Sequence, residues 1–236
     1  MIYSLDMALP AFAQRLMRPF TTSTRLSLTQ DSAGNSIPAN AQKATVAAGC
    51  FWGVEHLYRK HFGNGKGLLD AKVGYTGGGT TNPSYRHVCS GQTGRTYSPF
   101  TYALSSNPQE TSLLTSRISP DAESLQIIFD PNILTYRQIL EFFYRMHDPT
   151  TLNRQGADLG TQYRSAIFWH DDEQEKIAKE ITEKVEKQWY KKPITTQIAQ
   201  AGTWYDAETY HQLYLENNPG GYECPAHFVR NFPELE

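Results

Sequence analysis

The chain has 236 residues, of which 39% are hydrophobic and 12% aromatic, so it can bury the core of one or two domains. Its 22 basic and 24 acidic residues give a net charge of −2, a balance that disfavours a nucleic-acid-binding protein. The longest apolar stretch without a charge, residues 46–54, is too short to span a membrane. We therefore expect a protein that binds neither nucleic acid nor a membrane.

Residues 1–40 are predicted to lie outside the folded domain. They contain several arginines among many Ser and Thr residues and few acids, which is the composition of an organellar transit peptide. The same composition fits a disordered tail equally well. The expected location is therefore cytoplasmic or mitochondrial.

Strands and helices are predicted to alternate irregularly after this tail. The predicted strands are short segments that are apolar or rich in β-branched residues: 43–48, 68–75, 124–129, 163–169 and 194–199. Helical periodicity or i,i+4 charge pairs predict helices that begin at residues 51, 135 and 171, and a short helix over 206–216. The pattern indicates an α+β two-layer sandwich, with helices packed on a mostly antiparallel, mixed sheet.

Residues 41–216 are expected to form one catalytic domain with an insertion. Ten of the 25 residues in 96–120 are Ser or Thr and three are Pro, which is typical of a loop, here within a predicted hairpin. Residues 217–236 contain Gly and Pro and are predicted to be an exposed, flexible coil.

Cys50 lies where the first predicted strand passes into a helix. The N–H groups and the dipole of a helix N-terminus lower the pKa of a thiol, which predicts a reactive nucleophile rather than a buried structural cysteine. Gly49 and Gly53 on either side are expected to let another molecule approach the sulfur closely. Phe51 and Trp52 are either core aromatics or an apolar cage for one end of a small substrate.

The segment GCFWG at 49–53 resembles the signature of the methionine sulfoxide reductase A family. Further segments resemble that family in the same order: GYTGG (74–78), NPSY (82–85), HDPT (147–150), NRQG (153–156), DLGTQYRS (158–165) and YHQLYL (210–215). The resemblance spans about residues 44–228. It implies a ferredoxin-like core and a monomeric enzyme that reduces methionine S-sulfoxide, free and in proteins, as repair of oxidative damage.

The resemblance also implies roles for individual side chains. A glutamate would protonate the sulfoxide oxygen and two tyrosines would hold it; the tyrosines map to Tyr75 and Tyr163, with Asp158 near the second. The family's Thr-Gly-His-Ala-Glu motif is interrupted here, and its end reappears as Asp-Ala-Glu at 121–123. Because the strand and turn after it match the family, Glu123 is the expected proton donor, and Glu110 is a weaker candidate. An apolar pocket would raise the pKa of such a carboxyl.

The reaction would leave a sulfenic acid on Cys50, which condenses readily with a second thiol. The family often places a resolving cysteine in a glycine-flanked C-terminal tail, and Cys224 has that setting. The resemblance implies a Cys50–Cys224 disulfide reduced by thioredoxin, without a cofactor or metal. Cys89 is interpreted as a buried structural thiol. A zinc site at Cys224 and His227 is rejected, because no second ligand pair accompanies them.

Two other functions compete with this interpretation. A cysteine hydrolase would use His147 or His211 as a base on Cys50 and would need no reductant. A redox-sensing or sulfoxide-binding module would use the Phe51–Trp52 cage without turnover. The reductase ranks first, the hydrolase second and the binding module third.

Overall fold

A computed structural model describes residues 30–31, 34, 36–90 and 120–236. Most of the predicted tail (1–40) and of the predicted loop insertion (96–120), including Glu110, therefore lies outside the described residues. Within the described part of the chain, no helix is long and apolar enough to cross a membrane.

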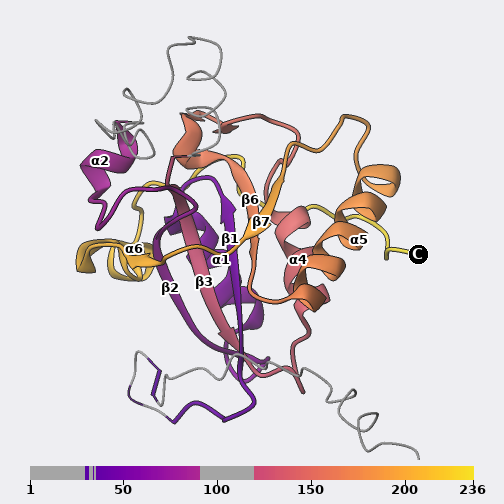
Figure 1. Cartoon of the computed structure of the whole chain (residues 1–236), viewed down its shortest axis with the longest axis horizontal. Coiled ribbons are helices and arrows are strands. Elements are labelled where there is room, and N and C mark those ends of the chain that lie inside the picture. The colour runs from indigo at the N-terminus through magenta and orange to yellow at the C-terminus, as the bar shows by residue number, and fades with distance from the viewer. Residues whose placement is uncertain (1–29, 32–33, 35, 91–119) are drawn as a thin grey trace, which may run out of the picture.

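A six-stranded mixed sheet lies at the centre of the described structure (Figure 1). Its strand order is β7-β6-β1-β3-β2-β8, and all neighbours are antiparallel except the parallel pair β6 and β7. The strands are β1 (Gln42–Ala48), β2 (Leu68–Thr76), β3 (Ala122–Phe129), β6 (Ser165–Trp169), β7 (Gln197–Gln200) and β8 (Tyr205–Asp206). A separate two-stranded ladder joins β4 (Arg154–Gln155) to β5 (Asp158–Leu159).

Helices pack on this sheet to form the larger of two core clusters. The helices are α1 (Phe51–Phe62), α2 (Tyr85–Cys89), α4 (Tyr136–Met146), α5 (Asp172–Gln188) and α6 (Tyr214–Asn217). The larger cluster joins α1, α4 and α5 to β1, β2 and β3, and the smaller one contains alanines and Phe168. The predicted α+β sandwich is confirmed.

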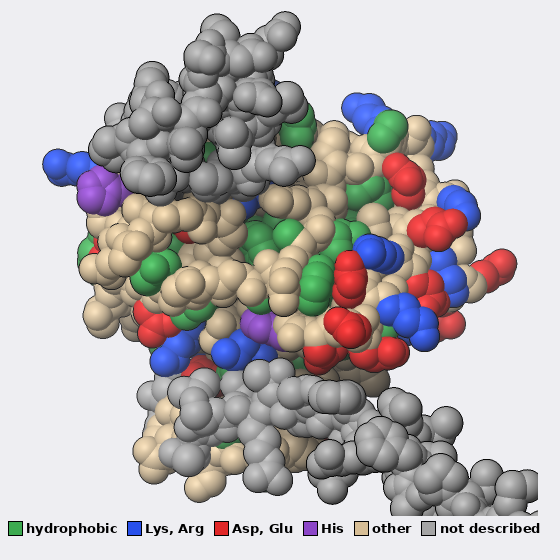
Figure 2. Space-filling model, in the orientation of Figure 1, with side chains coloured by type: hydrophobic (Ala, Val, Ile, Leu, Met, Phe, Trp, Pro, Cys, Tyr) green, Lys and Arg blue, Asp and Glu red, His purple; other side chains and the backbone are tan. Residues whose placement is uncertain are grey.

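Local sequence signals explain where the long helices begin. Thr135 and Gln138 form a reciprocal capping box at the start of α4, and the Asp171 side chain accepts a hydrogen bond from the Gln174 N–H at the start of α5. The predicted i,i+4 ion pairs of α5 are present, such as Lys179–Glu175 at 2.7 Å. Charges of both signs therefore mix over the α5 side of the surface (Figure 2).

Three predicted elements differ from the structure. One is the strand predicted over 194–199, which is β7 over Gln197–Gln200. The predicted helix over 206–216 is wrong: this segment holds the end of β8, a 3₁₀ turn over Thr209–His211 and the start of α6. Leu213 interrupts it with a left-handed backbone (φ 54°), and its N–H donates to the Glu55 carboxylate at 2.8 Å. The predicted strand over 163–169 begins at Ser165, because residues Thr161–Tyr163 form a 3₁₀ turn. The predicted hairpin is confirmed by the β2–β3 pairing.

Candidate active site

Cys50 is the N-cap residue of α1 and is separated from the end of β1 by one residue, Gly49, where the sequence predicted the passage from strand to helix. It is buried, with 7% of its surface exposed. Burial and the carboxylate of Glu123 raise the pKa of its thiol well above the usual range. Hydrogen bonds from the Trp52 and Gly53 N–H groups lower this pKa, but by less. The expectation of a lowered pKa is therefore wrong for the free protein, because burial outweighs the helix N-terminus.

Gly49 and Gly53, on either side of Cys50, allow other side chains of the protein to pack against the Cys50 turn. Gly49 has a left-handed backbone (φ 94°), and a Cβ there would lie 2.6 Å from the Gln155 side chain. A Cβ at Gly53 would collide with the His227 ring. The expectation that these glycines leave space for another molecule is corrected: Gln155 and His227 fill that space.

Glu123 lies on β3 beside the start of α1. Its side chain is buried and accepts a hydrogen bond from the Phe51 N–H at 3.2 Å. Burial raises the pKa of this carboxyl to about 8, although the hydrogen bond from Phe51 lowers it. A carboxyl with this pKa is mostly protonated at neutral pH, and its neutral form removes a negative charge from beside Cys50.

Tyr85 and Tyr163 are two of the three phenols whose pKa the charge of Cys50 raises; the third, Tyr222, is more exposed. Burial raises the pKa of each hydroxyl, and the charges of Glu123 and Cys50 raise those of Tyr85 and Tyr163 further. Tyr163 was expected in the site, whereas sequence reasoning missed Tyr85. The signal was available, because Tyr85 ends the NPSY motif.

Tyr75 has a different hydrogen-bond partner from the one expected of a sulfoxide-holding phenol. Its hydroxyl is buried and donates to Glu208 at 2.8 Å. The same carboxylate accepts from the Tyr85 N–H at 3.0 Å, at the start of α2, while the N-cap hydroxyl of Ser84 interacts with His87. Glu208 thus fixes Tyr85, a role that sequence could not reveal because the two residues lie 123 positions apart.

Phe51 fits the interpretation as a core aromatic, whereas Trp52 fits the interpretation as part of an apolar substrate cage. Phe51 is buried in the core, and its ring packs 5.1 Å from that of His211. Trp52 is half-buried; its indole N–H donates to His211 Nδ1 at 3.0 Å, and its ring stacks on Tyr214 at 3.7 Å. Trp52 is therefore the better candidate for the apolar wall of a substrate site.

Cys224 is packed rather than exposed. Only 2% of its surface is accessible, and its Sγ lies 3.5 Å from the Gln155 carbonyl oxygen. Burial raises the pKa of this thiol to about 11. The Asp158 carboxylate, which accepts a hydrogen bond from the Tyr222 hydroxyl at 2.9 Å, also raises the pKa of both Cys224 and Cys50. The expected exposed, flexible setting of this thiol is corrected, and both thiols are free.

Cys89 is half-buried, so the expectation that this thiol is buried is wrong. Burial raises the pKa of its thiol, whereas hydrogen bonds from the hydroxyls of Tyr85 and Tyr163 lower it by less. The Cys89 thiol therefore lies next to the hydroxyls of Tyr85 and Tyr163.

The two histidines considered as hydrolase bases are both engaged elsewhere. His147 interacts with the Phe143 carbonyl at 2.6 Å and with the Ser165 hydroxyl at 2.8 Å, and burial lowers its pKa to about 3. His211 uses Nδ1 to accept from Trp52. Within the described residues no hydrogen bond joins either ring to the Cys50 thiol, which disfavours the hydrolase. Across residues 36–90 and 120–236, no group of three potential metal ligands is present.

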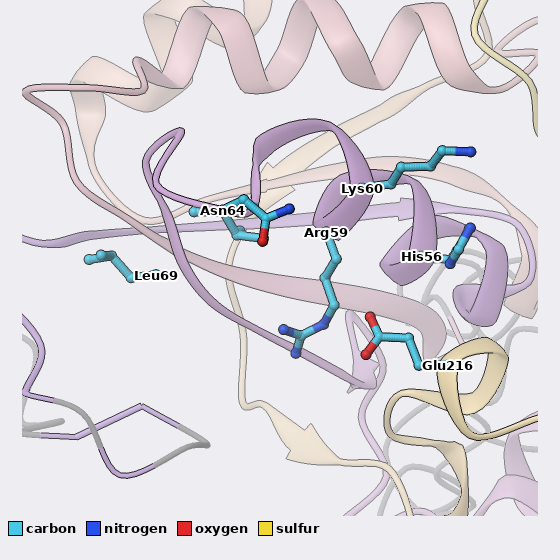
Figure 3. A pocket seen from close by; sticks show the side chains of 8 residues that line it. His56, Arg59, Lys60, Asn64, Leu69 and Glu216 are labelled. Carbon is cyan, nitrogen blue, oxygen red and sulfur yellow. The ribbon is translucent and has the colours of Figure 1, made fainter.

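A separate pocket lies beside the second half of α1 (Figure 3). Arg59 and Glu216 both contribute to its lining. Arg59 already pairs with Glu55 at 3.0 Å and with Asp70 at 3.6 Å, so its charge is largely neutralised. None of the candidate site residues lines this pocket.

Comparisons with known proteins identify the family of this chain. Residues 42–98 and 95–233 match the family model described as peptide methionine sulfoxide reductase. A Schizosaccharomyces pombe relative named "Probable peptide methionine sulfoxide reductase" is 46% identical over 190 residues, which cover 80% of this chain and 96% of the relative.

Two solved structures of Mxr1 from Saccharomyces cerevisiae are also similar. The reduced form has a TM-score of 0.68 at 37% identity and covers 86% of this chain and 100% of Mxr1. Mxr1 in complex with Trx2 has a TM-score of 0.50 at 26% identity, with coverage of 86% and 100%. This chain belongs to the peptide methionine sulfoxide reductase family.

Proposed function

We propose that this chain reduces methionine S-sulfoxide, free and in proteins, to methionine and so repairs oxidative damage. The observation that carries the proposal is the buried carboxyl of Glu123, whose pKa is raised to about 8 beside the helix that Cys50 caps. Sulfoxide reduction needs a nucleophile for sulfur and a proton for oxygen, and this pair can supply both. Family membership supports the same reaction.

The first step joins Cys50 to the substrate. The Cys50 sulfur bonds to the sulfoxide sulfur while Glu123 delivers its proton to the oxygen, and the thiol proton given up by Cys50 restores the Glu123 carboxyl. The hydroxyls of Tyr85 and Tyr163 donate hydrogen bonds to that oxygen as it gains charge. The oxygen passes to Cys50 as a sulfenic acid, the sulfide leaves as methionine, and the face of Trp52 receives the apolar end of the substrate.

The second step returns the enzyme to its thiol state. Cys224 condenses with the sulfenic acid to form a Cys50–Cys224 disulfide and water. The common influence of Asp158 on both thiols supports this pairing. Thioredoxin then reduces the disulfide by thiol exchange, which the Mxr1–Trx2 complex of the yeast relative supports.

Separated S and R sulfoxide epimers test the proposal. With dithiothreitol as reductant, the wild type should consume the S epimer, and Cys50→Ser should consume neither. Equal use of both epimers, or activity that survives the loss of Cys50, would reject it. The selectivity for S rests on the resemblance to the family.

A further inference from the structure

The imidazole of His227 lies against the turn that carries Cys50. Its Nε2 lies 2.6 Å from the carbonyl oxygen of Ala48, so Nε2 carries the proton and donates it. A Cβ at Gly49 would lie 3.2 Å from Nε2, and one at Gly53 would collide with Nδ1. The ring therefore contacts the backbone on both sides of Cys50, and within the described residues Nδ1 has no hydrogen-bond partner.

His227 also belongs to the turn that carries Cys224. The His227 N–H donates to the Cys224 carbonyl at 2.9 Å, so backbone geometry links the imidazole to the thiol. A Cβ at Gly156 would lie 3.3 Å from the Cys224 Sγ, which places this sulfur against the Gln155–Gly156 backbone. Gln155 in turn packs on Gly49. The Cys50 and Cys224 turns thus contact each other through His227 and through Gln155.

We propose that His227 is a positioning residue for the resolving step: it fastens the Cys224 turn to the Cys50 turn. The inference rests on the proposed Cys50–Cys224 disulfide. In that step the Cys50 S–OH and Cys224 S–H groups become an S–S bond and water, so no further oxidant is needed. In the part of the chain that the structure describes, no hydrogen bond joins the imidazole to either reacting sulfur. The imidazole acts by holding the second thiol near the first, which raises the effective concentration of the thiol.

A single turnover without reductant separates this role from a general structural one. One equivalent of S-sulfoxide is added, methionine is counted, and dimedone traps any sulfenic acid that persists. His227→Ala should form its one methionine at the wild-type rate, yet close the disulfide about tenfold more slowly and accumulate the dimedone adduct. Phe228→Ala, which alters a 53% exposed neighbour, should behave like the wild type.

Two polar variants keep the test informative if His227→Ala does not fold. The amide of His227→Gln reaches about as far as Nε2, so it should donate to Ala48 and restore most of the closure rate. His227→Asn has the same polarity but a shorter reach, and it should close slowly. Equal closure rates for these two variants and the wild type would overturn the inference, as would an equal slowing of methionine formation and closure.

Cys224→Ser distinguishes failure of the inference from failure of the proposed disulfide. If Cys224→Ser also forms a bridge, or its sulfenic acid is no longer-lived than that of the wild type, the proposed disulfide is wrong. If Cys224→Ser accumulates sulfenic acid while His227→Ala closes normally, only the role of His227 is refuted.

Discussion

Glu123 accepts a hydrogen bond from the backbone N–H of Phe51, the residue that follows Cys50. This contact joins the middle of the sheet to the start of α1 and places an acid beside the candidate nucleophile. The bond is buried, so it forms in an environment where the neutral carboxyl is favoured. The chemistry of the site follows from this relationship.

Glu123→Gln removes the proton donor and keeps the shape of the side chain. We expect methionine formation in a single turnover to slow by about 100-fold or more, the usual contribution of general acid catalysis. The pKa of Cys50 should fall, because the Glu123 carboxylate raises it. Alkylation of Cys50 by iodoacetamide should therefore become faster above about pH 8, where Glu123 is ionised in the wild type. A variant with full turnover would contradict the assignment.

The pH dependence of the first step should show the titration of Glu123. The proton-donating form is fully present below the folded-state pKa of about 8 and is lost as the pH rises through it. We therefore expect the single-turnover rate to fall above about pH 8 in the wild type, and this fall to be absent in Glu123→Gln. The same alkaline fall in both proteins would assign it to another group.

Tyr85→Phe and Tyr75→Phe compare the two candidate phenols. Tyr85→Phe should slow methionine formation by about tenfold or more, because it removes a hydrogen bond to the developing charge. Tyr75→Phe removes only the bond to Glu208, so it should mainly lower the free energy of unfolding, by about 1 kcal/mol. Rate measurements and urea unfolding of both variants check this. The opposite order of rates would restore Tyr75 to the site.

Gly53→Ala tests the packing of His227 on the Cys50 turn. The added methyl group would collide with the ring, so we expect a loss of about 1–3 kcal/mol in the free energy of unfolding. Gly202→Ala is the matched control, because a Cβ there meets nothing within 4 Å. Equal urea midpoints for the two variants would show that the His227 ring moves aside without a loss of stability.

The sequence names a candidate nucleophile and a candidate acid but not the contacts that position them. Cys50 and Glu123 could be singled out because local motifs flank them. The partnership of Glu208 with Tyr85 and Tyr75 depends on segments brought together only by the fold. The raised pKa of Cys50 was missed for a similar reason: the helix N-terminus is visible in the sequence, whereas the burial that outweighs it depends on tertiary packing.

The elements were predicted best where local and tertiary preferences agree. The helices predicted to begin near residues 135 and 171 do so, with Thr135 and Asp171 as their N-caps. The helix predicted over 206–216 failed because Leu213 adopts a left-handed backbone and donates its N–H to Glu55, a contact with α1 that overrides the local pattern. Cys224 was wrongly expected to be exposed, because no local sequence signal reveals that its coil packs on Gln155.

Dimedone trapping in the Cys224→Ser variant decides whether Cys50 takes the oxygen of the sulfoxide. After one equivalent of S-sulfoxide without reductant, we expect one methionine per chain and the adduct on Cys50 by peptide mass spectrometry. Methionine formed with the adduct on Cys89, or with Cys50 unmodified, would show that another group carries the reaction.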